Sequence, residues 1–179
     1  IGSLLIHPLT TLLIYALGRR LFDPAVGFWA ATAYLSMPAV AMSSLLISTD
    51  VALLLFWSLS LYAFWRALEK DGTGWWLIAA LSLGLGLMSK YSMLLFGLSA
   101  LLYLLASPQH RGWWRDWRPW LAPLVAFALL APNLWWNLAH DFPTFRHTAH
   151  ISHLDQGRLH FGELAGFFFS QFAVFGPVL

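Results

Sequence analysis

The stretch PAVGFWAATAYLSMPAVAMSSLLIST, residues 24–49, runs for 26 residues without a formally charged side chain. A helix rises about 1.5 Å per residue, so about 20 residues are enough to cross the roughly 30 Å hydrocarbon core of a bilayer. Uncharged runs of comparable length recur at residues 72–89, 91–109 and 119–140. This rhythm predicts a membrane protein that crosses the bilayer several times.

The composition supports the same class. Hydrophobic residues make up 59% of the chain and charged residues 10%, whereas soluble domains carry roughly 45–50% and about 25%. The formal net charge is only +2, and the basic residues sit in short gaps between apolar runs. No contiguous basic patch is present to neutralise phosphates, so we expect no nucleic-acid partner. The absence of cysteine excludes disulfides, thiolate metal sites and thiol nucleophiles.

These runs predict an all-α fold, a polytopic transmembrane bundle of about seven spans with the first and last clipped. Pro38 and Pro132 fall inside two of the spans and are expected to kink them. The chain starts at Ile1 and ends within an apolar run, so we expect a fragment of one membrane domain, residues 1–179. The expected spans cover residues 3–18, 25–47, 49–66, 74–89, 91–107, 119–138 and 163 to the end.

The basic residues predict the orientation. Three of them, Lys90, Arg146 and Arg158, fall in one set of gaps, and the remaining seven fall in the alternate set. Because Lys and Arg accumulate on the cytoplasmic side, the richer set is expected to face the cytoplasm. The loop at residues 139–162, which holds most of the histidines, is then external. The seven cytoplasmic residues are Arg19, Arg20, Arg66, Lys70, Arg111, Arg115 and Arg118.

Two ionisable residues on the external side are candidate site residues. Asp50 follows Ser48 at the start of a span, where an acid complements the helix dipole and a serine caps the amides. The same position slightly below the membrane surface is also typical of functional acids. Lys90 lies at the tip of a tight hairpin. Its ammonium group is expected either to snorkel to the interface or, as we favour, to bind a lipid phosphate.

The end of the sixth span and the loop after it hold further candidates. Asn133 and Asn137 share one helix face, where they either satisfy backbone groups near Pro132 or line a cavity. Pro143 is expected to begin a short helix that covers an external cavity. Histidines in this loop are either solvated or ligands of a divalent metal. The candidate metal ligands are His140 and Asp141, beside the triplet His147, His150 and His153.

Gly84 and Gly86 follow an apolar run that predicts a helix, not a strand. A nucleotide-binding loop needs a strand before its glycines, so we interpret these residues as sites of close helix packing.

Several segments, in matching order, resemble bacterial members of glycosyltransferase family 39, relatives of the protein O-mannosyltransferases and of the aminoarabinose transferase that modifies lipid A. They are GRRLF at residues 18–22, STD at 48–50, GLGLMSKY at 84–91, PNLWWN at 132–137 and HDFPTF at 140–145. The resemblance covers nearly the whole chain. Each segment is moderately specific, and the ordered set is more so.

The resemblance implies a membrane fold of the GT-C type and an enzyme of the bacterial inner membrane. Such an enzyme moves a sugar from a polyprenyl-phosphate carrier to a lipid, glycan or protein acceptor at the periplasmic face. Its main catalytic base is expected in an external loop before Ile1, so this fragment is expected to be inactive alone. A divalent metal is the one cofactor that we consider.

The resemblance also assigns roles to residues. Asp50 would support catalysis, and Lys90 and Arg146 would bind the donor phosphate. Asn133, Asn137 and His147 would line the cavity or hold the acceptor. Lys90 stands in a Ser-Lys pair where the family has Thr-Lys.

Two other classes remain open at this point. A transporter or flippase subunit would also show kinked spans and an acid within the membrane. It would more often show inverted repeats and charges near the bilayer midplane, whereas the ionisable residues here gather at one face. A structural subunit is the third class, and it gives the external histidine-rich loop no role.

Overall fold

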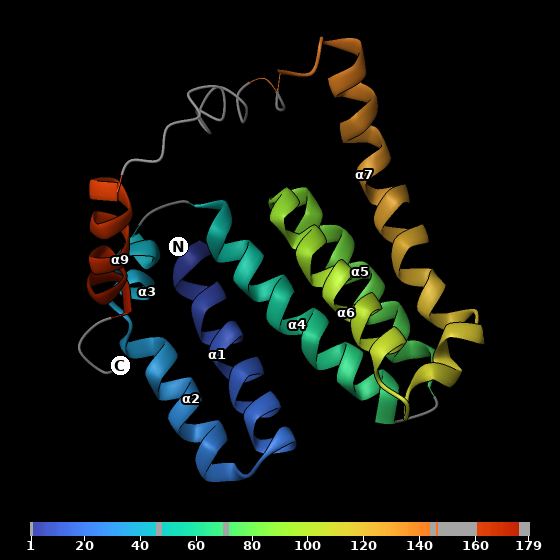
Figure 1. Ribbon diagram of the computed structural model, residues 1–179, viewed down its shortest axis with the longest axis horizontal. Helices are drawn as coiled ribbons and strands as arrows, with labels where there is room; N and C mark the ends of the chain where they lie inside the picture. Colours follow the sequence, from blue (N-terminus) through green and yellow to red (C-terminus); the bar gives the residue numbers. More distant parts are fainter. Residues whose placement is uncertain (1, 46–47, 70–71, 144–145, 147–160, 176–179) are drawn as a thin grey trace. The chain divides into compact units, whose positions relative to one another are not determined.

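The chain forms helices at every predicted span (Figure 1). The computed structural model describes residues 2–45, 48–69, 72–143, 146 and 161–175. Within these ranges no strand is present, so the predicted all-α fold is confirmed. The helices are α1 (Gly2–Leu21), α2 (Pro24–Ser36), α3 (Pro38–Leu45), α4 (Thr49–Glu69), α5 (Thr73–Ser89), α6 (Leu94–Ala106), α7 (Leu121–Ala139) and α9 (Phe161–Phe175), with 3-10 turns η1 (Tyr91–Met93), η2 (Arg111–Arg115) and η3 (Arg118–Trp120).

The two prolines predicted to kink helices behave differently. The predicted span over residues 25–47 is broken at Met37 into α2 and α3, which meet at 56°. Met37 is extended, with ψ 127°, and Pro38 begins the next helix, as a proline does at a first helical position. Pro132, by contrast, lies inside α7, which continues unbroken to Ala139. The break at Pro38 is therefore confirmed, and Pro132 interrupts no helix.

The length and composition of the helices support membrane insertion. Thr49–Glu69 and Arg118–Ala139 are each long and apolar enough to cross a bilayer, and the bent pair α2 and α3 is a third candidate if it acts as one span. Helices α5 and α6 are apolar but shorter. The positions of the predicted spans are thus confirmed as helices, and the number that crosses the membrane stays a prediction.

The chain divides into two compact units, residues 1–130 and residues 131–179. In the first unit α1 packs against α2 and α4, and α4 packs against α5 (Figure 1). Its core contains buried aromatic and aliphatic side chains from α4, α5, η1, α6 and α7. The members are Phe64, Ala67, Trp76, Leu83, Leu87, Met93, Phe96, Leu104 and Ala126.

Glycines permit the closest helix contacts in this unit. A Cβ atom on Gly27 of α2 would lie 2.7 Å from the Tyr15 carbonyl oxygen of α1. A Cβ atom on Gly84 would lie 2.5 Å from the Leu129 side chain, and one on Gly86 would lie 2.7 Å from Met93 Cγ. Gly84 and Gly86 therefore serve close packing, as predicted, and not a nucleotide loop.

A continuous apolar surface lies on α6. Leu94, Leu98 and Leu102 recur every four residues, and each exposes more than half of its side chain. A large exposed apolar surface is unfavourable in water but is the normal outer surface of a helix in lipid. In the second unit α9 carries a similar run of exposed phenylalanines, at Phe167, Phe168 and Phe169.

Candidate functional site

Asp50 lies in the first turn of α4. Its backbone N–H donates to Ser48 Oγ at 3.1 Å, and the Ser48 hydroxyl donates to Asp50 Oδ2 at 3.1 Å. The expected serine cap is therefore present. Because Ser48 occupies only the backbone N–H and one carboxylate oxygen of Asp50, the other oxygen is left for a second partner.

That partner is Lys90. Its Nζ donates to Asp50 Oδ1 at 2.5 Å, across 40 residues of sequence. Lys90 links α5 to η1 in an extended conformation, with its backbone N–H donating to the Gly86 carbonyl at 2.9 Å. The two side chains remain 47% and 54% exposed, so a ligand can reach the pair. The structure thus brings together two residues that the sequence analysis treated separately.

A second ion pair lies at the opposite end of α4. The Arg20 guanidinium, from the end of α1, pairs with the Glu69 carboxylate, which also accepts a 2.8 Å hydrogen bond from Trp65 Nε1. Asp50 and Glu69 are separated by about 28 Å of helix, close to the hydrocarbon thickness of a bilayer. This places Lys90 and Arg20 at opposite ends of one span, as the distribution of basic residues predicts.

In the second unit, the end of α7 collects the predicted polar residues. Asn137 is buried, and its Nδ2 donates to the Asn133 carbonyl oxygen at 3.0 Å and to Asn133 Oδ1 at 3.3 Å. The shared helix face of these two residues is confirmed. Asp141 and Phe142 have φ values of 61° and 56°, and the Phe142 N–H donates to the Asn137 carbonyl at 2.8 Å. This left-handed turn ends the helix in the manner of a Schellman cap.

His140 has a fixed orientation. Its ring stacks on Trp136 at 4.5 Å between centroids, and Nδ1 lies 2.8 Å from the Trp136 carbonyl oxygen. A carbonyl oxygen only accepts hydrogen bonds, so Nδ1–H donates to it, and in the neutral form of the ring Nε2 then has the lone pair that can bind a metal. Among the residues that the structure describes, no group of three potential ligands comes together. Metal binding by His140 and Asp141 stays a prediction.

The remaining predicted residues lie beyond α7. The Arg146 N–H donates to the Phe142 carbonyl at 3.0 Å and its side chain is exposed, and Pro143 is helical, as expected for a helix that starts there. His147, His150, His153 and most of the predicted loop at 139–162 lie outside the described residues.

A buried polar network near the α2–α3 break was not anticipated from the sequence. His7 Nδ1 lies 2.8 Å from the Tyr34 hydroxyl, and Nε2 lies 2.9 Å from Ser43 Oγ. Because the Ser43 hydroxyl donates to the Val40 carbonyl at 3.1 Å, the His7 Nε2–H donates to Ser43 and the Tyr34 O–H donates to Nδ1. The neutral imidazole thus ties α1 to both halves of the bent pair. The sequence feature that could have indicated this network is His7, a histidine within an apolar run and beside Pro8.

The chain is similar to three groups of curated proteins. It is 35% identical to a lipid A galacturonosyltransferase, RgtD, of Rhizobium johnstonii over 98% of this chain and 37% of the relative. It is 35% identical to a lipopolysaccharide core galacturonosyltransferase, RgtA, of the same organism over 71% of this chain and 27% of the relative. An undecaprenyl phosphate-alpha-4-amino-4-deoxy-L-arabinose arabinosyl transferase of Pseudomonas aeruginosa is 34% identical over 78% of this chain and 26% of the relative.

The chain therefore spans little more than a third of the length of RgtD and about a quarter of the other two. No solved structure matches it significantly. The relatives are all named glycosyltransferases, which agrees with the resemblance seen in the motifs. Residues 1–136 match the family described as dolichyl-phosphate-mannose-protein mannosyltransferase, and the chain belongs to that family of membrane glycosyltransferases.

Proposed function

We propose that the protein transfers a sugar from a polyprenyl-phosphate carrier to lipid A or the lipopolysaccharide core. The names of the relatives support this choice, since they specify lipid A, the lipopolysaccharide core and an undecaprenyl-phosphate donor. The reaction takes place at the periplasmic face of the bacterial inner membrane. Family membership favours a transferase over the transporter class.

The observation that carries the proposal is the contact between Lys90 and Asp50. In the transfer, an acceptor hydroxyl forms a new bond to the anomeric carbon, the bond from that carbon to the phosphate oxygen breaks, and the lipid phosphate leaves with the bonding electrons. Negative charge on the phosphate therefore grows along the reaction. A fixed ammonium group beside it stabilises the transition state more than the ground state.

In this scheme Asp50 is a positioning residue. Its carboxylate, itself fixed by Ser48, holds the Lys90 ammonium through one of the three N–H donors of that group. The other two donors are directed elsewhere and serve the phosphate. The proton of the acceptor hydroxyl passes to a general base, which we do not assign to a residue of this chain.

We assign supporting roles to the second unit. Arg146 provides a further contact to the donor phosphate, and the face carrying Asn133 and Asn137, with His147, borders the acceptor. His140 and Asp141 are the proposed contact for a divalent ion. Treatment with EDTA should then stop transfer and Mg²⁺ or Mn²⁺ should restore it, while full activity in EDTA would remove the metal from the proposal.

The test compares two ion pairs of the same helix. In the natural full-length protein, reconstituted in vesicles, Lys90→Ala and Asp50→Asn should each strongly reduce sugar transfer to lipid A. The matched variants Arg20→Gln and Glu69→Gln break the pair at the other end of α4 and should leave transfer nearly intact. Equal losses from both pairs would show that the assay reports helix stability, and unchanged transfer in Lys90→Ala would remove the site.

A further inference from the structure

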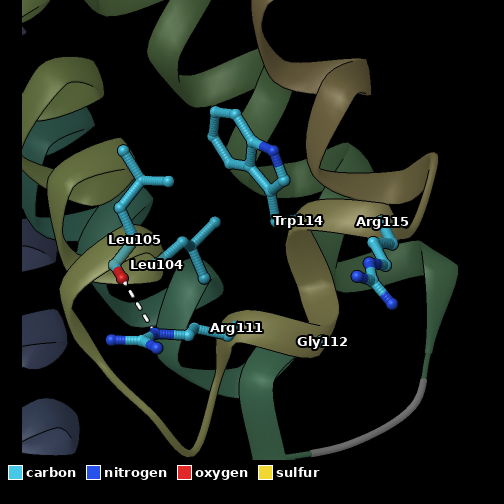
Figure 2. A pocket seen from close by; sticks show the side chains of 6 residues that line it. All are labelled: Leu104, Leu105, Arg111, Gly112, Trp114 and Arg115. Atoms are coloured by element: carbon cyan, nitrogen blue, oxygen red, sulfur yellow. Dashed lines mark hydrogen bonds between the residues drawn. The ribbon is translucent and has the colours of Figure 1, made fainter.

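A cavity of about 460 Å³ lies in the first unit beside the end of α6 (Figure 2), whereas Lys90 precedes the start of that helix. Its volume lies within the roughly 300–1,000 Å³ typical of small-molecule sites. Most of its lining side chains are exposed, so the cavity is accessible from outside. The lining residues are Leu104, Leu105, Arg111, Gly112, Trp114 and Arg115.

The lining combines an apolar floor with two arginines, whose guanidinium groups point to opposite sides of the η2 turn in Figure 2. Leu104 is buried and Leu105 is partly exposed, so together they give the cavity a hydrocarbon surface. Figure 2 shows the Arg111 side chain reaching back to α6, where its Nε donates to the Leu105 carbonyl at 3.3 Å. This bond holds the side chain at the cavity and uses one of its five N–H donors.

Asp116, the acid next to Arg115 in the sequence, does not neutralise the charge of Arg111 or Arg115. The Asp116 carboxylate is engaged by Arg118, whose Nε and Nη2 donate to it at 2.9 Å and 2.7 Å. Within the described ranges, neither Arg111 nor Arg115 forms an ion pair with a carboxylate. An apolar cavity with two positive charges is suited to an anion that carries hydrocarbon.

The tryptophans around the cavity indicate its depth in the membrane. Trp114 packs edge-on against Trp120 at 5.0 Å, and Trp117 exposes 63% of its side chain. Tryptophans gather at the headgroup level of a bilayer. The cavity follows α6, which runs back towards the end of α4 that holds Glu69. This is the side that the basic residues assign to the cytoplasm, where anionic lipids attract basic groups.

We propose that this cavity binds the headgroup of an anionic phospholipid of the cytoplasmic leaflet. Arg111, beside Leu105, contacts the phosphate, and Arg115 attracts the anionic headgroup by its charge from the other side of the turn. Leu105 and Trp114 contact the glycerol and the first acyl carbons. The site is separate from sugar transfer and does not depend on the proposed function. Loss of the basic groups of the site should lower lipid affinity about fivefold per arginine.

The test is a lipid titration of the natural full-length protein in a neutral detergent, followed by its thermal unfolding. Phosphatidylglycerol should raise the unfolding midpoint in a saturable manner, whereas phosphatidylcholine and inorganic phosphate should not. Arg111→Gln and Arg115→Gln should each weaken the apparent affinity for phosphatidylglycerol about fivefold. The control Arg19→Gln removes an exposed arginine of the same predicted side that lies outside the cavity, and should leave the affinity unchanged.

Each alternative result overturns the proposal. Equal stabilisation by inorganic phosphate would identify a simple anion site and not a lipid site. Equal weakening by Arg19→Gln would mean that the lipid responds to the general charge of the surface. If a cavity variant fails to fold, methionine replaces the arginine at that position, because it removes the charge and keeps an apolar stem against the lining. Unchanged affinity in the folded variants at both positions would exclude the site.

Discussion

The contact between Asp50 and Lys90 permits a test that separates its structural role from its chemical role. The double variant Asp50→Lys/Lys90→Asp exchanges the two charges and keeps an ion pair between the same positions. The side chains are 47% and 54% exposed, and an exposed ion pair stabilises a protein by about 0.2–1 kcal/mol. Loss of the pair should therefore cost no more than about 1 kcal/mol of stability, and the exchange should restore the ion pair but not the favourable interaction of an acid with the N-terminus of α4.

The effect on transfer should be much larger. Removal of one group that stabilises developing negative charge typically lowers turnover about 10²–10³-fold, or about 2.7–4 kcal/mol. We expect losses of this size in Lys90→Ala and in the double variant, because the ammonium group no longer stands at position 90. The assays are thermal unfolding in detergent and transfer from polyprenyl-phosphate galacturonate or aminoarabinose to lipid A. Recovery of transfer in the exchanged pair would refute the phosphate role of Lys90.

Three further outcomes follow from contacts away from this pair. Tyr34→Phe removes the hydroxyl that contacts the buried His7 imidazole. It should lower the unfolding free energy by about 1 kcal/mol, since hydrogen bonds between membrane helices contribute about 0.6–1.7 kcal/mol. An unchanged midpoint in thermal unfolding would contradict this prediction. Gly27→Ala places a Cβ atom against the α1 backbone and should cost about 1–3 kcal/mol, whereas Gly74→Ala, with nothing within 4 Å of the added atom, should not destabilise the protein. Hydrogen bonds from Arg118 lower the pKa of Asp116 from 3.8 to about 2. The stability that this carboxylate provides is therefore complete above about pH 4 and is lost as the pH falls towards 2. The difference in unfolding midpoint between the protein and Asp116→Asn should shrink over that range, and a constant difference would contradict the assignment.

The positions of the helices were predictable because each expected span is a long apolar run bounded by charged or turn residues. The breaks in the helices were harder to predict, since Pro38 and Pro132 both lie within apolar runs. At Pro38 the preceding residue adopts an extended conformation and the chain bends by 56°. At Pro132 the helix continues. Proline removes one hydrogen bond in either case, and whether the helix then bends depends on packing that the sequence does not specify.

The site was predictable only in part. Asp50 begins α4 and Lys90 follows α5, and the short link between these helices makes them antiparallel, so both residues were expected at the external end. Their direct contact also depends on the rotation of each helix about its axis. That rotation is set by packing in the core, where Ser60 of α4 donates to Ser82 of α5 at 2.8 Å. A hydrogen bond between two particular serines is not visible in a hydrophobic pattern.

The arginines on the side predicted to be cytoplasmic show how one sequence feature acts both during membrane insertion and in the folded protein. During insertion the count of Lys and Arg determines orientation, and acidic residues contribute little, so Arg20, Arg111, Arg115 and Arg118 act alike. In the folded chain they differ. Arg20 and Arg118 form ion pairs with carboxylates, whereas Arg111 and Arg115 line an apolar cavity. The positive-inside rule explains why arginines lie on this side but requires no cavity, and an anionic lipid accounts for two that line one and form no ion pair with a described carboxylate.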